Sequence, residues 1–271
     1  MKKFLTLLEI DFRGILGIII GFFGAVTVLS MLAFWGSSSN ANAWLSQMII
    51  QSGMTVAQYV EQNGYFTLMH VMELHYAIFI FLFFGLIGAT SLWVWNREWA
   101  GKSKGIYFLL SLKGSRLRIL ATKTMVIIVT SWLYYGLIIV NLFIGEFMMN
   151  WIFTDGLVGN DLVTEYLRLA TQPLNIIAPD TLGSLVHMTL FTVAVFLTMT
   201  VWILLIKSFR LKGGLVGLAY SAAMMAIYIY THFVLWLFAD ERIFVEWGFL
   251  FGSITISFGI SWWLLNKKIS V

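Results

Sequence analysis

The chain has 271 residues, of which 60% are hydrophobic and 11% are charged. An average soluble domain carries about 25% charged residues, so this composition excludes a separate soluble domain and indicates a membrane protein. The formal charge of +4 needs no nucleic acid partner to explain it, and the absence of cysteine excludes disulfides and thiolate metal sites.

Six apolar stretches without Asp, Glu, Lys or Arg divide the chain. As helices, each is long enough to cross a hydrocarbon core of about 30 Å. They comprise residues 14–35, 74–95, 124–145, 185–206, 213–238 and 247–265. We therefore expect an all-α polytopic membrane protein with six transmembrane helices, forming a single transmembrane domain over residues 1–271.

Basic residues are concentrated on one side of these spans. Of the 17 Lys and Arg residues, 15 lie before the first span, after the last, or in the gaps that share their side. Only Arg168 and Arg242 lie on the other side. Because basic residues in short loops are retained in the cytoplasm, both termini are expected there, in a bacterial cell membrane whose anionic lipids attract the basic side.

Residues 2–13 place polar and apolar side chains on separate faces at helical spacing. This pattern predicts a surface helix on the cytoplasmic side before the first span, although an ordinary flanking stretch is the alternative. The first apolar run is longer than the core of a secretory signal and follows charged residues, so we expect it to remain uncleaved.

Small residues at four-residue spacing in the fifth span, Gly213, Gly217 and Ser221, predict close helix packing within one chain or between two copies, rather than a substrate site. A comparable row in the first span consists of Gly14, Gly17, Gly21 and Gly24. The spans lack the carboxylates and cations that ion-coupled carriers use, so active transport would need energy from another chain.

Two patterns resemble known sites without meeting their requirements. The segment 70–75 contains two histidines and one glutamate, but their spacing matches neither of the zinc-protease motifs HExxH and HxxEH. We therefore expect these residues to be solvated. The Gly-Lys-Ser at 101–103 resembles the end of a phosphate-binding loop, but Asn96 occupies the place of the leading glycine and no strand precedes it. We expect no catalytic, cofactor or metal site in this chain.

The gap between spans two and three, residues 96–123, carries seven basic residues and one acid around an apolar block. It predicts an amphipathic helix on the cytoplasmic surface, ending in a turn at which Ser115 is a plausible N-cap for the third span. Arg97 and Lys102 are expected to face lipid headgroups or solvent. A basic linker lying on anionic lipid is the alternative.

This arrangement resembles the membrane subunits of type-two ATP-binding-cassette exporters, in which the same loop forms a coupling helix that docks on an ATPase. Glu98 resembles the acid of that loop, residues 112–116 (LKGSR) its Leu-Pro-x-Ser-Arg turn, and Lys123 the lysine that opens span three. The chain departs from the family in the lysine that replaces the proline and in Lys-Gly at 104–105, where Gly-Thr is commoner. The resemblance assigns to the coupling loop Arg97, Glu98, Gly101, Lys104, Gly105, Leu112, Gly114, Ser115, Arg116 and Lys123.

The resemblance implies a permease subunit that works with a second or homologous permease copy and with a separate ATPase, which holds the ATP and Mg. It further implies outward transport of an amphiphilic compound, such as a peptide, a lipid or an antimicrobial, with no enzymatic activity in this chain. A non-transporting scaffold or sensor subunit is the alternative. An intramembrane enzyme ranks third, because no paired catalytic groups occur in the spans.

Overall fold

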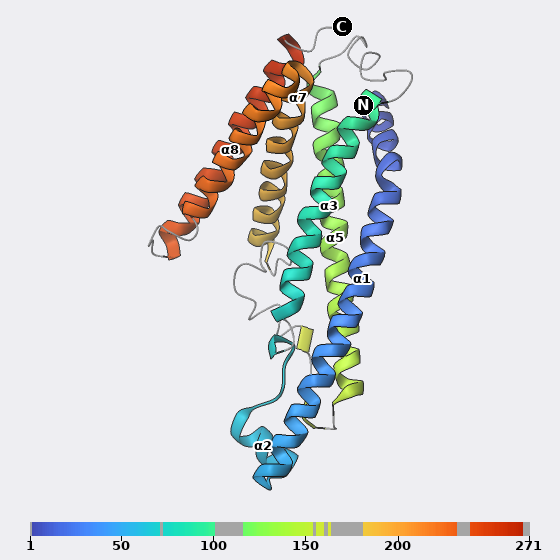
Figure 1. Ribbon diagram of the computed structural model, residues 1–271, viewed down its shortest axis with the longest axis vertical. Coiled ribbons are helices and arrows are strands. Elements are labelled where there is room, and N and C mark those ends of the chain that lie inside the picture. Colours follow the sequence, from blue (N-terminus) through green and yellow to red (C-terminus); the bar gives the residue numbers. More distant parts are fainter. Residues whose placement is uncertain are drawn as a thin grey trace. The chain divides into compact units, whose positions relative to one another are not determined.

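The computed structural model describes residues 2–70, 73–100, 116–153, 156–159, 162–163, 181–231 and 239–267. The long helices are α1 (Lys2–Ser52), α3 (Glu73–Ala100), α5 (Leu117–Ile152), α7 (Leu182–Ile229) and α8 (Ala239–Lys267) (Figure 1). Two short elements between α1 and α3 are α2 (Val56–Asn63) and the 3-10 helix η1 (Leu68–His70). The only β contact among the described residues is an isolated bridge between Phe66 and Val158, so the expected all-helical class is confirmed there.

All five long helices are apolar enough and long enough to cross a membrane. α1 has 51 residues and extends over about 77 Å, well beyond a hydrocarbon core of about 30 Å. Residues 2–13 belong to α1 without a break, so the predicted surface helix is not a separate element. Similarly, α8 begins at Ala239, before the predicted start of the last span at residue 247.

α7 is interrupted at Arg210, whose φ of 54° and ψ of −128° are not helical. Beyond this residue the chain turns back, so that Gly217 lies against Trp202. α7 is therefore a hairpin of two helical arms. The arms coincide with the predicted spans 185–206 and 213–238, the second of which the structure describes as far as residue 231.

α3 runs antiparallel to both α1 and α5. Near its end, the indole N–H of Trp93 donates to a carbonyl in the first part of α1 at 2.8 Å. The Val94 carbonyl accepts from Lys123 near the start of α5 at 2.9 Å. Near the beginning of α3, the Phe79 carbonyl accepts from Tyr134, which lies further along α5, at 2.8 Å.

α8 packs along the second arm of α7 in the opposite direction (Figure 1). The Tyr220 and Ser257 hydroxyls share a hydrogen bond of 2.7 Å, whereas Tyr228, further along α7, packs on Phe249, which comes earlier in α8. The end of α8 reaches the start of α5, where the Arg116 guanidinium donates to a carbonyl in the last turn of α8.

Contacts between the helices divide the chain into two compact units. Unit 1 consists of Met1–Ile19, Gly85–Ser131 and Val186–Val271, and unit 2 of Ile20–Phe84 and Trp132–Leu185. The largest fully buried side chains of unit 2 are Tyr134, Phe34, Phe79, Phe83, Leu45 and Leu68. Those of unit 1 are Trp95, Phe196, Ile15 and Lys123. A lysine in this apolar set requires a specific environment.

Candidate functional site

Lys123 lies near the start of α5 with a side chain that is 0% exposed. A buried ammonium group is strongly destabilising unless other groups compensate its charge and satisfy its N–H donors. The Nζ donates to the Val94 carbonyl at 2.9 Å and lies 4.9 Å from the centre of the Trp95 ring. Oδ2 of Asp11 is 3.9 Å from the same Nζ. A carbonyl, an aromatic face and a carboxylate therefore stabilise the buried charge.

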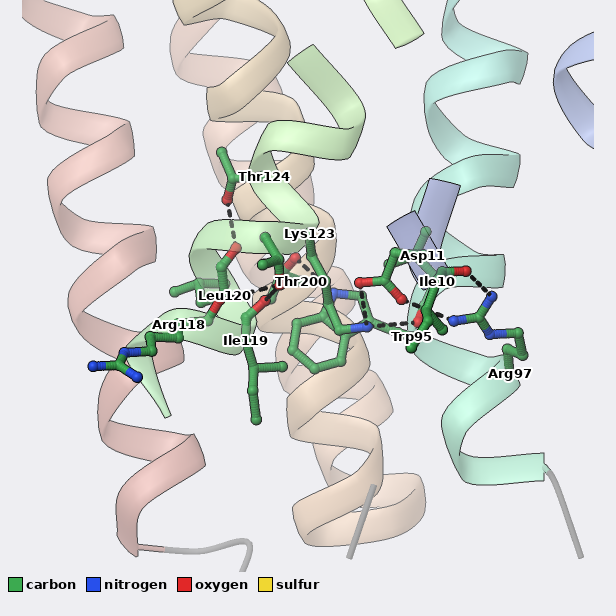
Figure 2. Close-up of polar contacts among 12 residues, drawn as sticks. Ile10, Asp11, Trp95, Arg97, Arg118, Ile119, Leu120, Lys123, Thr124 and Thr200 are labelled. Carbon is green, nitrogen blue, oxygen red and sulfur yellow. Dashed lines mark hydrogen bonds and ion pairs between the residues drawn. The ribbon is translucent and has the colours of Figure 1, made fainter. Parts of the chain in front are cut away.

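Asp11 supplies this carboxylate from α1, and its side chain is only 5% exposed. Its Oδ1 accepts from Nη2 of Arg97 at 2.8 Å, while Oδ2 faces Lys123. Arg97 also donates to the Ile10 carbonyl at 3.1 Å. Figure 2 shows the carboxylate between the two cations. We call Asp11, Arg97 and Lys123 the charge cluster; together they carry a formal charge of +1.

Gly14 makes room for the charge cluster, because a Cβ atom at this position would overlap the Arg97 guanidinium. The other glycines of the predicted row, Gly17, Gly21 and Gly24, have nothing within 4 Å of such an atom. Of this row, only Gly14 therefore makes a contact within the described chain that requires the absence of a side chain.

Trp95 connects the charge cluster to α7. Its indole N–H donates to Oγ1 of Thr200 at 3.1 Å, and both residues are buried (Figure 2). A second contact between α3 and α7 lies nearby, where the Nζ of Lys207 is 5.5 Å from the centre of the Trp99 ring. The charge cluster and Trp95 thereby join α1, α3, α5 and the first arm of α7.

The predicted coupling loop, residues 96–123, is partly helical, since α3 continues to Ala100 and α5 begins at Leu117. Of the residues assigned to it, Arg97 and Lys123 belong to the charge cluster, and Arg116 contacts α8. Glu98 is part of α3, but its side chain lies outside the described part of the structure. The remaining assigned residues also lie outside it: Gly101, Lys104, Gly105, Leu112, Gly114 and Ser115. The predicted coupling helix is thus not tested.

One expectation about the loop residues requires correction. Arg97 was expected to face headgroups or solvent, but its side chain is only 28% exposed and pairs with Asp11, because a buried carboxylate lies within its reach. Lys123 directly precedes the predicted third span and is enclosed within α5, which begins at Leu117; its expected place at the opening of that span is not tested.

Asp11 is a residue of the charge cluster that the sequence motifs did not predict. Asp11, Ile15 and Ile19 recur at four-residue spacing and are 4%, 0% and 3% exposed, so they form one buried face of α1. An acidic residue that continues an apolar helical face next to a span is the signal that could have identified it.

The small residues of the fifth span pack within the chain. A Cβ atom at Gly213 would overlap the Leu205 carbonyl oxygen, and one at Gly217 would overlap the Trp202 ring. Both glycines therefore serve close contact between the two arms of α7. Ser221 is half-buried, and its hydroxyl has no hydrogen-bond partner in the described part of the chain.

Comparisons with protein-family models, with curated proteins and with solved structures find no match for this chain. The site must therefore be interpreted from its own chemistry. Within the described residues, no group of three or more His, Asp and Glu could hold a metal ion. The charge cluster consists of groups that contact one another across helices, an arrangement suited to fixing or transmitting helix positions.

Proposed function

We propose that this chain is the permease subunit of an ATP-binding-cassette exporter, which moves an amphiphilic compound outward with energy from a separate ATPase. The observation that carries the proposal is the charge cluster. It attaches the ends of α3 and α5, which border the 101–115 segment, to α1, and Trp95 extends the connection to α7. A force applied to that segment would move the ends of α3 and α5 and, through these contacts, displace α1 and α7.

We also propose that the chain crosses the membrane six times. Five helices have the required length and composition, and the α7 hairpin offers a separate crossing in each of its arms. The alternating directions of neighbouring helices support this count. An even count leaves both termini on one side, and the basic residues at that side favour the cytoplasm.

The position of Lys123 is compatible with this scheme. α5 has 36 residues and extends over about 54 Å, so a residue near its start can lie at the membrane surface while the rest of the helix spans the hydrocarbon. The charge cluster then holds helix ends together close to the proposed ATPase, where a transmitting contact is needed.

A non-transporting scaffold or sensor subunit would use the same cluster only to stiffen the helix ends. Removing the Trp95–Thr200 hydrogen bond between α3 and α7 distinguishes the two functions. Thr200→Val removes the hydroxyl that accepts from Trp95, whereas the control Thr198→Val removes a hydroxyl that bonds only to the Ala194 carbonyl of its own helix. The chain is co-expressed with each ATPase encoded near its gene, and any complex that forms is reconstituted in nanodiscs.

We expect both threonine variants to bind the ATPase, but only Thr200→Val to lose substrate-stimulated ATP hydrolysis. The loss of one buried hydrogen bond, about 0.5–1.5 kcal/mol, would reduce the stimulation about two- to tenfold. Equal stimulation in both variants would contradict transmission through Trp95. Failure of the wild-type chain to retain any adjacent ATPase would favour the scaffold.

Docking is tested separately at Glu98, the single acid of the predicted coupling loop. If this carboxylate contacts the ATPase, Glu98→Ala and Glu98→Lys should weaken co-purification about ten- to a hundredfold, the effect of losing a charge-assisted contact. Lys102→Glu is the control, and membrane abundance is matched between variants. Loss of the ATPase in Lys102→Glu alone would instead favour a lipid-bound linker.

A further inference from the structure

The two compact units have opposite charge. Unit 2 contains seven acidic residues and one basic residue, which gives a formal charge of −6, whereas unit 1 carries +10. The acidic residues of unit 2 are Glu61, Glu73, Glu146, Asp155, Asp161, Glu165 and Asp180, and its basic residue is Arg168. Of these acids, Glu61 and Glu146 have side chains in the described part of the structure, and Glu61 is exposed.

Unit 2 also contains an open groove of about 540 Å³, lined by Val56, Ala57, Val60, Glu61, Tyr65 and Gly156. Sites for drug-sized ligands typically measure about 300–1,000 Å³ and combine apolar walls with a few polar groups. Here α2 supplies three aliphatic residues of the lining, and the polar residues of the lining are Glu61 and Tyr65. No ion pair joins Glu61 to another residue in the described part of the chain.

Hydrogen bonds hold the walls of this groove in place. A capping box fixes the start of α2, because Thr55 and Gln58 each bond to the other's backbone N–H. After α2, the N–H of Phe66 donates to the Leu157 carbonyl at 2.9 Å, which places the neighbouring Tyr65 beside the 156–159 segment. Gly156, with a φ of 87°, adopts a conformation that favours glycine.

We propose that this groove binds amphiphilic organic cations. The aliphatic side chains of α2 would contact the apolar body, the Tyr65 ring would face the cationic centre, and Glu61 would supply the counter-charge. The Glu61 carboxylate would disfavour an anion of the same shape. Binding of such a compound is independent of transport; its identification as the exported cargo rests on the function proposed above.

The test uses tetraphenylphosphonium and tetraphenylborate, which have nearly the same shape and opposite charge. The purified full chain is placed in nanodiscs of zwitterionic lipid, without an ATPase, and binding is measured by equilibrium dialysis against empty nanodiscs. We expect saturable binding of the cation at one site per chain and none of the anion above the empty-disc value. Equal binding of both ions, or no excess of the cation, would overturn the proposal.

Two pairs of variants locate the site. Glu61→Gln should weaken cation binding about two- to fivefold, as expected for one exposed charge pair, whereas Glu9→Gln removes an exposed acid of unit 1 and should have no effect. Ala57→Lys adds a cation to the groove and should abolish binding. Asn40→Lys adds the same charge to unit 2 at an exposed position that does not line the groove, and should weaken binding less.

Unchanged binding in Glu61→Gln, or equal effects of the two lysine substitutions, would overturn the assignment to this groove. Both substituted positions in the groove are exposed, so the fold should tolerate them, and thermal unfolding of each variant verifies this. Since no ATPase is present, failure of cation binding would leave the proposed transport function intact. Conversely, loss of ATPase coupling would leave the groove intact.

Discussion

Lys123 and Asp11 are buried together in unit 1, with side chains 0% and 5% exposed, and each compensates the charge of the other. Removing water from two ions costs several kcal/mol per ion, which their attraction only partly offsets. The Val94 carbonyl and the Trp95 ring supply additional stabilisation to the lysine. The stability of this site is therefore asymmetric: removing one ion should cost much more than replacing both with apolar groups.

Asp11→Asn should lower the free energy of unfolding by about 3–5 kcal/mol, because it leaves Lys123 buried without a counter-charge. The control is Glu9→Gln, since Glu9 also lies in α1 and pairs with Arg13 at 2.8 Å, but both side chains are exposed. That change should cost less than about 1 kcal/mol. Thermal unfolding in one detergent, followed by tryptophan fluorescence, compares the variants.

The double variant Asp11→Asn with Lys123→Met separates charge from packing. An apolar side chain of similar length needs no counter-charge, so the double variant should regain most of the stability lost in Asp11→Asn. If the double variant unfolds at as low a temperature as Asp11→Asn, an unpaired lysine is not the cause of the stability lost in the single variant.

At the scale of the helices, close packing between the arms of α7 depends on individual glycines. A Cβ atom at Gly213 would overlap the Leu205 carbonyl oxygen, whereas at the adjacent Gly214 the nearest atom would be Cγ1 of Ile206 at 3.7 Å, an ordinary contact. Backbone atoms cannot move away as a flexible side chain can. The two neighbouring glycines thus have different tolerance for the same added methyl group.

Gly213→Ala should destabilise the hairpin by about 1–3 kcal/mol, the usual cost of forcing an extra group into a packed contact. Gly214→Ala should be neutral or should stabilise by up to about 1 kcal/mol, because alanine favours the helical conformation more than glycine does. Thermal unfolding midpoints measured side by side provide the comparison. Equal midpoints for the two variants would contradict the packing of the arms described here.

In the turn between the arms, Arg210 has a φ of 54°, a backbone conformation that is strained for residues other than glycine. Arg210→Gly should therefore raise the free energy of unfolding by about 1 kcal/mol. Lys212→Gly, in the helical part of the second arm, should instead lower it by about 0.5–1 kcal/mol. Opposite shifts of the unfolding midpoint are expected; a decrease of similar size in both would argue against strain at Arg210.

The helices themselves could largely be predicted, because charge-free apolar runs mark α1, α3, α5, α7 and α8. The extension of α1 to Ser52 could not, since its Ser- and Asn-rich part has low helix propensity. Packing in unit 2 stabilises this part: Leu45 is fully buried, and the Asn42 amide donates to the Ile152 carbonyl at 3.0 Å. Tertiary contacts here override the local preference.

The candidate site was only partly predictable for a related reason. Arg97 and Lys123 entered through the family resemblance, but their partner Asp11 is 86 residues from Arg97 in the sequence. A single sequence contains no signal that pairs residues so far apart. The resemblance therefore pointed to two cations, whereas the carboxylate that pairs with them became evident only in the contacts between α1, α3 and α5.

At the scale of the whole molecule, the count of membrane crossings decides the orientation. With α7 as a hairpin of two crossings, the start of α1 and the end of α8 lie on one side of the membrane. With α7 as one crossing, they lie on opposite sides. Since the natural chain has no cysteine, a single introduced cysteine gives an unambiguous label site. Exposed positions suited to labelling are Glu9, Asn40, Asn63, Lys212 and Asn266.

We expect a membrane-impermeant maleimide to label cysteines at Asn40 and Asn63 in intact cells, because these positions lie beyond the first apolar run, on the side with few basic residues. Cysteines at Glu9, Lys212 and Asn266 should react only in inverted vesicles, since all three lie on the basic side in the six-crossing arrangement. Lys212 is the most informative position, because it follows the α7 turn and would be buried in lipid if α7 crossed once. A cysteine there that reacts from neither side, together with one at Asn266 that reacts in intact cells, would replace six crossings with five.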